Sequence, residues 1–180
     1  MGIAIPQVIT SDRASGAQVI DGSLKFDSSS SQYLKRSLTA DGNRRLWTWS
    51  GWLKRTPGSL QDVFSAGQES TNDGLYSRFR IDSTDYLNFR QWTDGPTFDA
   101  QVTSNMVLRD PSAFFHYVII YDTAQSTDAD KVRQYINGQQ VTSFSSGDYP
   151  ALNAPSHINR STKTHTIGGH YDGGGTNADS

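Results

Sequence analysis

The sequence predicts an all-β domain, built as an antiparallel sandwich or barrel. Short runs that alternate apolar and polar residues recur about every ten residues, and turn-forming residues separate them. Serine, threonine, aspartate, asparagine and glycine are abundant, whereas Glu69 is the only glutamate. The abundant residues favour turns and caps over helix interiors, and no window keeps a helical period. A chain of 180 residues is long enough for one such domain.

The regular pattern begins at about residue 21, so we expect an N-terminal arm at 1–20 and one domain at 21–180. Outside the tryptophan-rich run described next, strands are predicted at Leu24–Phe26, Tyr33–Arg36, Val63–Phe64, Leu75–Asp82, Tyr86–Trp92, Phe114–Asp122, Val132–Ile136, Gln139–Phe144 and Thr164–Gly168. Phe114–Asp122 is the most apolar run, and we expect it to be the most central strand. Asn137-Gly138 is typical of a type I′ hairpin turn.

The run WTWSGWLKR contains three of the four tryptophans. Trp47, Trp49 and Leu53 fall at even spacing, so they share one face of a strand. Trp52 falls on the opposite face. We therefore expect Trp47 and Trp49 to hold two sheets together, and Trp52 to point outward.

Composition excludes several classes of function. The net charge is -2, which leaves no basic field for nucleic-acid phosphates. No apolar run approaches the roughly 20 residues that span a bilayer, so no membrane insertion is expected. There are no cysteines, which excludes disulfides and thiolate metal sites and favours folding in a reducing cytosol. The first residues lack the basic start and apolar core of a secretory signal.

The sequence predicts no enzyme. Glycoside hydrolysis needs two carboxylates on either side of the scissile bond, and Glu69 alone cannot supply a glutamate pair. Asp128 and Asp130 have same-face spacing, but they lie in the polar segment AQSTDADK, which is typical of a solvated loop. The sequence also lacks a G-x-S-x-G motif and a phosphate-binding glycine loop.

No cofactor is expected, and the residues that a metal would use are better explained as turn and surface residues. Asp172 and Asp179, in the glycine-rich C-terminal segment, are weak calcium candidates because calcium prefers carboxylate and carbonyl oxygens from loops. His165 and His170 lie nearby in sequence, but no loop of alternating acidic ligands accompanies them.

Aromatic side chains are the remaining candidates for ligand binding, because sugars stack on rings that have a polar edge. The candidate ligand-binding residues are Trp52, Arg90, Trp92, Tyr171 and Asp172. The polar loops 68–74, 94–98 and 171–179 are candidates for a binding rim.

Several runs, taken in order, resemble one family. LKFDSSSSQYLKR, WTWSGWLKR, VFSAG, YLNFRQW, FFHYVIIYD, VRQYINGQQV and HTIGG are similar to successive strands of laminin-G-like, concanavalin A-like jelly-roll domains. The similarity is greatest to the branch found in structural proteins of tailed bacteriophages, such as tail fibres and virion surface proteins. The resemblance implies a two-sheet antiparallel jelly-roll sandwich. In that family a further strand follows the IGG strand, and here the sequence reaches Ser180 without it. We expect the chain to be part of a longer protein, or a neighbouring chain to supply this strand.

The resemblance implies a non-enzymatic module of a phage virion that is assembled in the host cytoplasm. A tail-fibre or adhesin module would bind a host surface glycan or receptor. The alternative is a purely structural virion protein, such as a head decoration or an assembly interface, and a glycoside hydrolase is a remote third. Expected partners are other virion proteins, a host glycan and further copies of the chain, with no nucleic acid.

Overall fold

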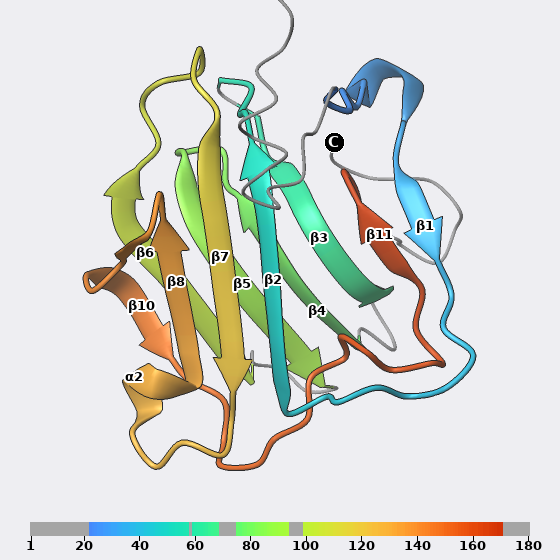
Figure 1. Cartoon of the computed structure of the whole chain (residues 1–180), viewed down its shortest axis with the longest axis vertical. Coiled ribbons are helices and arrows are strands. Elements are labelled where there is room, and N and C mark those ends of the chain that lie inside the picture. Colours follow the sequence, from blue (N-terminus) through green and yellow to red (C-terminus); the bar gives the residue numbers. More distant parts are fainter. Residues whose placement is uncertain (1–21, 58, 69–74, 94–98, 171–180) are drawn as a thin grey trace, which may run out of the picture.

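The computed structural model describes residues 22–57, 59–68, 75–93 and 99–170. The predicted arm and the predicted rim loops lie outside these residues, except for Gln68, which ends a strand. Two antiparallel sheets pack face to face, and Figure 1 shows the smaller sheet lying in front of the larger one. The all-β jelly-roll prediction is therefore confirmed. No helix among the described residues is long and apolar enough to span a membrane.

The larger sheet has seven strands in the order β1-β11-β3-β4-β5-β6-β10. Their bounds are β1 Leu34–Arg36, β3 Gln61–Gln68, β4 Leu75–Ile81, β5 Tyr86–Thr93, β6 Ala100–Val107, β10 Phe144–Asp148 and β11 His165–Ile167. The smaller sheet has four strands in the order β2-β7-β8-β9. Their bounds are β2 Leu46–Leu53, β7 Phe115–Asp122, β8 Val132–Ile136 and β9 Gln139–Gln140. A 3-10 turn, η1, covers Ser28–Ser30, and a short helix, α2, covers Asp128–Lys131.

The tryptophans of β2 join the two sheets as predicted. Trp47 stacks on Tyr121 of the neighbouring β7, with ring centroids 5.2 Å apart, and tilts against Phe89 of the larger sheet at 6.3 Å. Trp49 meets Phe79 of the larger sheet edge to face at 4.9 Å. Aromatic pairs in these arrangements stabilise a core beyond the area they bury. The WTWSGWLKR run is thus a core strand with one outward-facing tryptophan.

β7 is an inner strand of the smaller sheet, as its apolar sequence predicts. Its side chains alternate strictly, so Tyr117, Ile119 and Tyr121 are fully buried while the residues between them are half-exposed on the outer face. Burial raises the pKa of both tyrosines, because the phenolate would be poorly solvated. Tyr117 donates a hydrogen bond to Gln134, whose amide donates in turn to the Val102 carbonyl of the larger sheet.

Four details differ from the sequence predictions. Leu24–Phe26 is not a strand, and Leu24 is largely exposed. The strand β6 was not predicted, because a register shift opposite β5 interrupts its alternation. The predicted return strand Gln139–Phe144 divides: β9 covers only two residues, and β10 begins at Phe144 in the other sheet. The predicted loop around Asp128 forms α2, where Asp128 pairs with Lys131 at 2.6 Å.

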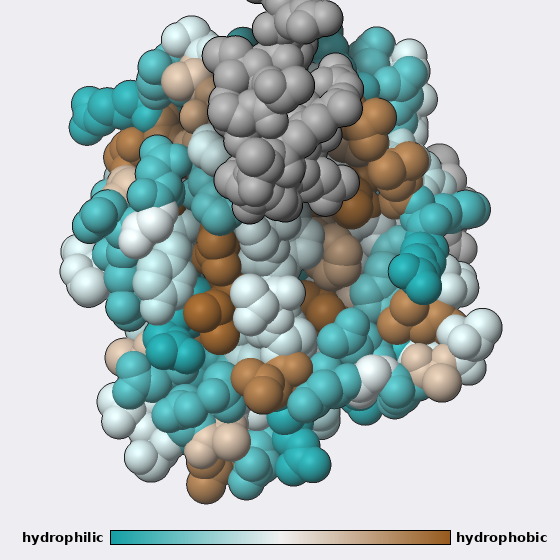
Figure 2. All heavy atoms as spheres, viewed as in Figure 1, coloured by the Kyte–Doolittle hydropathy of each residue, from teal (hydrophilic) through white to brown (hydrophobic). Residues whose placement is uncertain are grey.

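The outer face of the smaller sheet is partly apolar. Trp52, Leu46 and Phe114 are 63%, 52% and 48% exposed. Figure 2 shows apolar groups in separate patches among polar side chains on this side of the molecule. Among the described strands β2 pairs only with β7. The further strand that the family resemblance implies after HTIGG stays a prediction.

Candidate functional site

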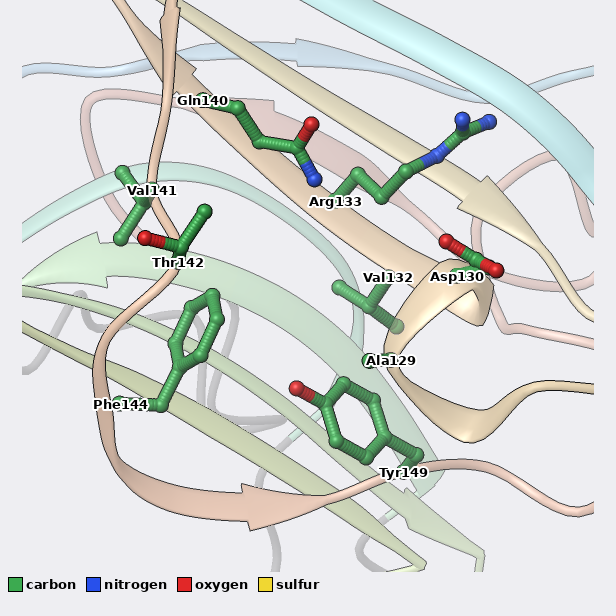
Figure 3. A pocket seen from close by; sticks show the side chains of 9 residues that line it. All are labelled: Ala129, Asp130, Val132, Arg133, Gln140, Val141, Thr142, Phe144 and Tyr149. Carbon is green, nitrogen blue, oxygen red and sulfur yellow. The ribbon is translucent and has the colours of Figure 1, made fainter.

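Two hollows in the described part of the chain are candidates for a ligand site, and they differ in position, size and chemistry. The first lies at the side of the sandwich, between β8 and β10, and has a volume of about 180 Å³. In Figure 3 the rings of Phe144 and Tyr149 form one side of it, opposite Val132 and the short helix α2. Both rings pack against the main core. This side hollow is smaller than the roughly 300 Å³ at which ligand pockets begin, and we interpret it as a gap at the sandwich edge.

The second hollow, here called the end pocket, has a volume of about 360 Å³. It lies where β4 begins and β5 ends, at the lower end of the sandwich in Figure 1. Its lining residues are Arg44, Leu75, Gln91, Thr93, Asp99, Ala151, Ala154, Pro155, His157 and Arg160. Leu75, Thr93 and Asp99 directly flank two of the loops that the sequence predicts as a binding rim.

One wall of the end pocket is the connection between β10 and β11, which runs along this end of the sandwich (Figure 1). Core side chains hold this connection in place. Tyr121 and Thr123 both donate hydrogen bonds to the Ala154 carbonyl, each at 3.0 Å. The indole of Trp47 donates to the Ser156 hydroxyl at 2.8 Å, and the backbone N–H of His157 donates to the Ser77 hydroxyl at 2.9 Å.

Residue Arg44 fastens the same wall from the other side. Its Nε donates to the Ser156 carbonyl at 2.8 Å, and the Ser156 N–H donates back to the Arg44 carbonyl at 2.8 Å. Gln91, which is 1% exposed, lies at the base of the pocket and accepts a hydrogen bond from Ser77 at 3.1 Å. The wall is therefore fixed by reciprocal hydrogen bonds before any ligand arrives.

The one imidazole in the pocket is buried and neutral. His157 is 2% exposed, and burial lowers its pKa to about 4, with the positive charges of Lys163, Arg160 and Arg44 acting in the same direction. A contact with the Trp92 backbone raises the pKa, but it is the smallest of these effects. Nε2 of His157 has no hydrogen-bond partner of normal geometry. At neutral pH the end pocket therefore contains an uncharged imidazole beside two guanidinium groups.

The residues singled out in the sequence do not form one site. Trp52 lies on the outer face of the smaller sheet, where its ring is 5.2 Å from that of His116. Arg90 and Trp92 lie on the outer face of the larger sheet, on the far side of the sandwich, opposite Arg78 and Tyr76 of β4. Tyr171, Asp172 and Asp179 lie outside the described residues.

The outer face of the larger sheet is polar but offers little open surface. Arg78 is 3% exposed and Tyr76 5%, and the Arg78 guanidinium lies over the Tyr76 ring at 4.8 Å. Asp62 on β3 makes a 2.7 Å contact with His170. Arg90 and Trp92 are half-buried here, and neither side chain is without an interaction partner. The side chains on this face are largely buried and contact one another, so the end pocket is the better candidate for a ligand-binding site.

The described residues contain no group of three or more histidine, aspartate or glutamate side chains that could hold a metal ion. The calcium candidates Asp172 and Asp179 are outside this part of the chain, so the structure does not place them. Sequence reasoning missed the pocket residues Arg44 and Arg160, because they lie in connections that carry no strand pattern.

Comparison with known proteins identifies the family. The model of the concanavalin A-like lectin/glucanases superfamily, of laminin-G type, matches residues 9–179, and the match begins inside the predicted arm. None of the curated protein sequences matches the chain significantly.

Solved structures with the same fold are distant in sequence. The carbohydrate-binding module CBM40 of a Ruminococcus gnavus IT-sialidase, bound to α2,6 sialyllactose, is 13% identical with a TM-score of 0.53, over 81% of this chain and 84% of that one. The same module bound to α2,3 sialyllactose is 12% identical with a TM-score of 0.52, over 79% and 83% of the two chains. A SAP-like pentraxin from Limulus polyphemus is 13% identical with a TM-score of 0.50, over 82% of this chain. The chain spans only 62% of that pentraxin.

Proposed function

Because the chain belongs to the concanavalin A-like lectin/glucanases superfamily, we propose that it is a non-catalytic carbohydrate-binding domain. The end pocket carries this proposal. Its volume of about 360 Å³ lies within the range of small-ligand sites, and it combines guanidinium, amide, hydroxyl and imidazole groups with the apolar side chains of Leu75 and Pro155. A sugar presents a similar mixture of hydroxyl groups and apolar C–H surface.

Rigidity of the pocket wall also supports a binding role. Because the segment from Ala154 to His157 is hydrogen-bonded to core side chains, little conformational entropy remains to be lost when a ligand binds. Two of the structural neighbours are carbohydrate-binding modules with a bound sugar, which is compatible with this function. Fold similarity alone does not transfer a ligand, so the pocket has to be tested directly.

The test is a glycan array probed with the wild-type chain and with an Ala151→Trp variant. Ala151 lines the end pocket and is exposed, so a large ring fits there without disturbing the core and blocks the pocket. Leu152→Trp is the matched control, because Leu152 is 59% exposed and does not line the pocket. We expect Ala151→Trp to abolish glycan binding and Leu152→Trp to retain it. A wild-type chain that binds no glycan contradicts the proposal.

A second candidate function is a structural role in a phage virion, in which the chain contacts other virion proteins and further copies of itself. The exposed side chains of Leu46, Trp52 and Phe114 on the outer face of the smaller sheet favour such a contact. We propose this face as the protein-facing side, and a host glycan as the ligand of the end pocket. Cryo-EM of an assembled particle would test it: this face buried against a neighbour supports the proposal, and the face open to solvent contradicts it.

A further inference from the structure

The end pocket concentrates positive charge. Arg44 and Arg160 both line it, and the Arg44 side chain is 23% exposed. Burial lowers the pKa of Arg44, and the positive charge of Arg160 adds to this effect, so the two cations lie close enough to repel each other. The described contact of the Arg160 guanidinium is with a neutral ring nitrogen, Nδ1 of His157, at 3.5 Å.

Among the described residues, cations outnumber carboxylates around the pocket: the positive charges of Lys163, Arg160 and Arg44 all act on His157, whereas Asp41 and Asp99 supply two negative charges. Asp41 lies 3.9 Å from Arg44, and its carboxylate accepts two hydrogen bonds from Ser161, at 2.6 and 2.7 Å, which lower its pKa and so favour its charged form. Asp99 lines the pocket at its exposed rim. Gln91, Thr93 and His157 supply neutral polar groups between the rim and the base.

We propose that the end pocket selects sugars that carry a carboxylate, and that Arg160 and Arg44 bind that carboxylate. Arginine suits this task because its planar guanidinium donates two parallel hydrogen bonds to a carboxylate. The anion also relieves the repulsion between the two guanidinium groups, which a neutral sugar does not. The inference rests on the proposed carbohydrate-binding function and adds the class of sugar.

Two roles can be separated within the pocket. Arg44 donates a hydrogen bond from Nε to the Ser156 carbonyl and so positions the pocket wall. Its two terminal guanidinium nitrogens are not used in this bond and can bind a ligand. Arg160 has no such backbone bond among the described contacts, so it can be changed with less effect on the wall. Arg160 is therefore the residue to test.

The experiment has two stages. A glycan array compares sialylated and uronic-acid glycans with their neutral counterparts, and calorimetry then measures the best acidic glycan, its neutral counterpart and inorganic phosphate. The variants are Arg160→Gln and Arg160→Lys, with Arg133→Gln as matched control, because Arg133 lines the side hollow instead. Thermal unfolding of each variant verifies that it is folded.

We expect the acidic glycan to bind and its neutral counterpart to bind at least about tenfold more weakly. Arg160→Gln should lose about tenfold to a hundredfold in affinity, Arg160→Lys should lose less because it keeps the charge, and Arg133→Gln should match the wild type. Equal affinity for acidic and neutral glycans overturns the inference and leaves the carbohydrate-binding function standing. Acidic binding that is unchanged in Arg160→Gln, or phosphate binding as tight as the glycan, also overturns it. No glycan binding at all overturns the proposed function itself.

Discussion

Protonation of the buried imidazole His157 should make the stability of this domain depend on pH. The folded pKa is about 4, and the reference value for an exposed histidine is about 6.5. Below about pH 6.5 the unfolded chain takes up a proton that the folded chain does not, so the free energy of unfolding falls as the pH decreases towards the folded pKa. Above about pH 6.5 both states are neutral and the full stability is present.

The size of the effect follows from the two pKa values. One pKa unit corresponds to about 1.4 kcal/mol, so the whole window is worth about 3 kcal/mol. Between about pH 7.5 and about pH 4.5 the expected loss from His157 is about 2.5 kcal/mol. Burial also lowers the pKa of His165, so that residue contributes in the same direction, and the carboxylates add their own dependence.

The measurement is urea unfolding of the wild type and of His157→Gln across this pH range. Gln does not titrate, so subtracting the two curves removes the contributions that both proteins share. We expect the stability difference between the proteins to change by about 2.5 kcal/mol over the range, with the wild type losing more on acidification. Parallel curves would refute the reasoning, and an NMR titration of the imidazole provides an independent value of the pKa.

Three further predictions concern the core, the turns and the outer face, each measured by urea unfolding. Trp47→Phe removes the indole donor to Ser156 as well as ring area, so it should cost about 1–3 kcal/mol more than Trp49→Phe, and equal costs would contradict this. Gly67→Ala should cost more than about 3 kcal/mol, because φ is +105° and a Cβ would lie 2.1 Å from the Leu75 carbonyl oxygen. Gly138→Ala, at φ +79° with nothing within 4 Å, should cost only about 1–2 kcal/mol, and equal losses would argue against the clash. Trp52→Ala should change stability by less than about 1 kcal/mol and leave glycan binding intact, because the ring is 63% exposed on the other sheet.

Strand pattern made most of the fold predictable, because alternation is a local property of the sequence. The inward and outward faces of β2 were predicted correctly from its alternation, and β7, predicted as the most central strand, is an inner strand of the smaller sheet. The strand β6 was missed where a register shift breaks the alternation, and the sheet to which β10 belongs depends on pairing with β6. Register and sheet membership arise from contacts between distant segments, which the local pattern does not record.

Predictability of the candidate site was lower for a related reason. Alternation placed Trp52 on the outward face of its strand, but it does not say which sheet that strand or the strand of Arg90 and Trp92 joins, and the structure places them in different sheets. The end pocket is formed by residues from connections. Arg44 precedes β2 and Arg160 precedes β11, and hydrogen bonds between these two segments help to bring the guanidinium groups together.

The same bonds tie the candidate site to the core. The wall of the end pocket is held by Trp47, Tyr121 and Thr123, and the two aromatic rings stack on each other within the core. A core substitution that moves Trp47 therefore releases the Ser156 hydroxyl and loosens the wall that Arg44 also holds. The conformational entropy of this wall is lost during folding rather than during binding, so more of the interaction energy of the pocket residues contributes to affinity. It follows that Trp47→Phe, although Trp47 does not line the pocket, should weaken glycan binding as well as folding, whereas Trp49→Phe should affect folding alone.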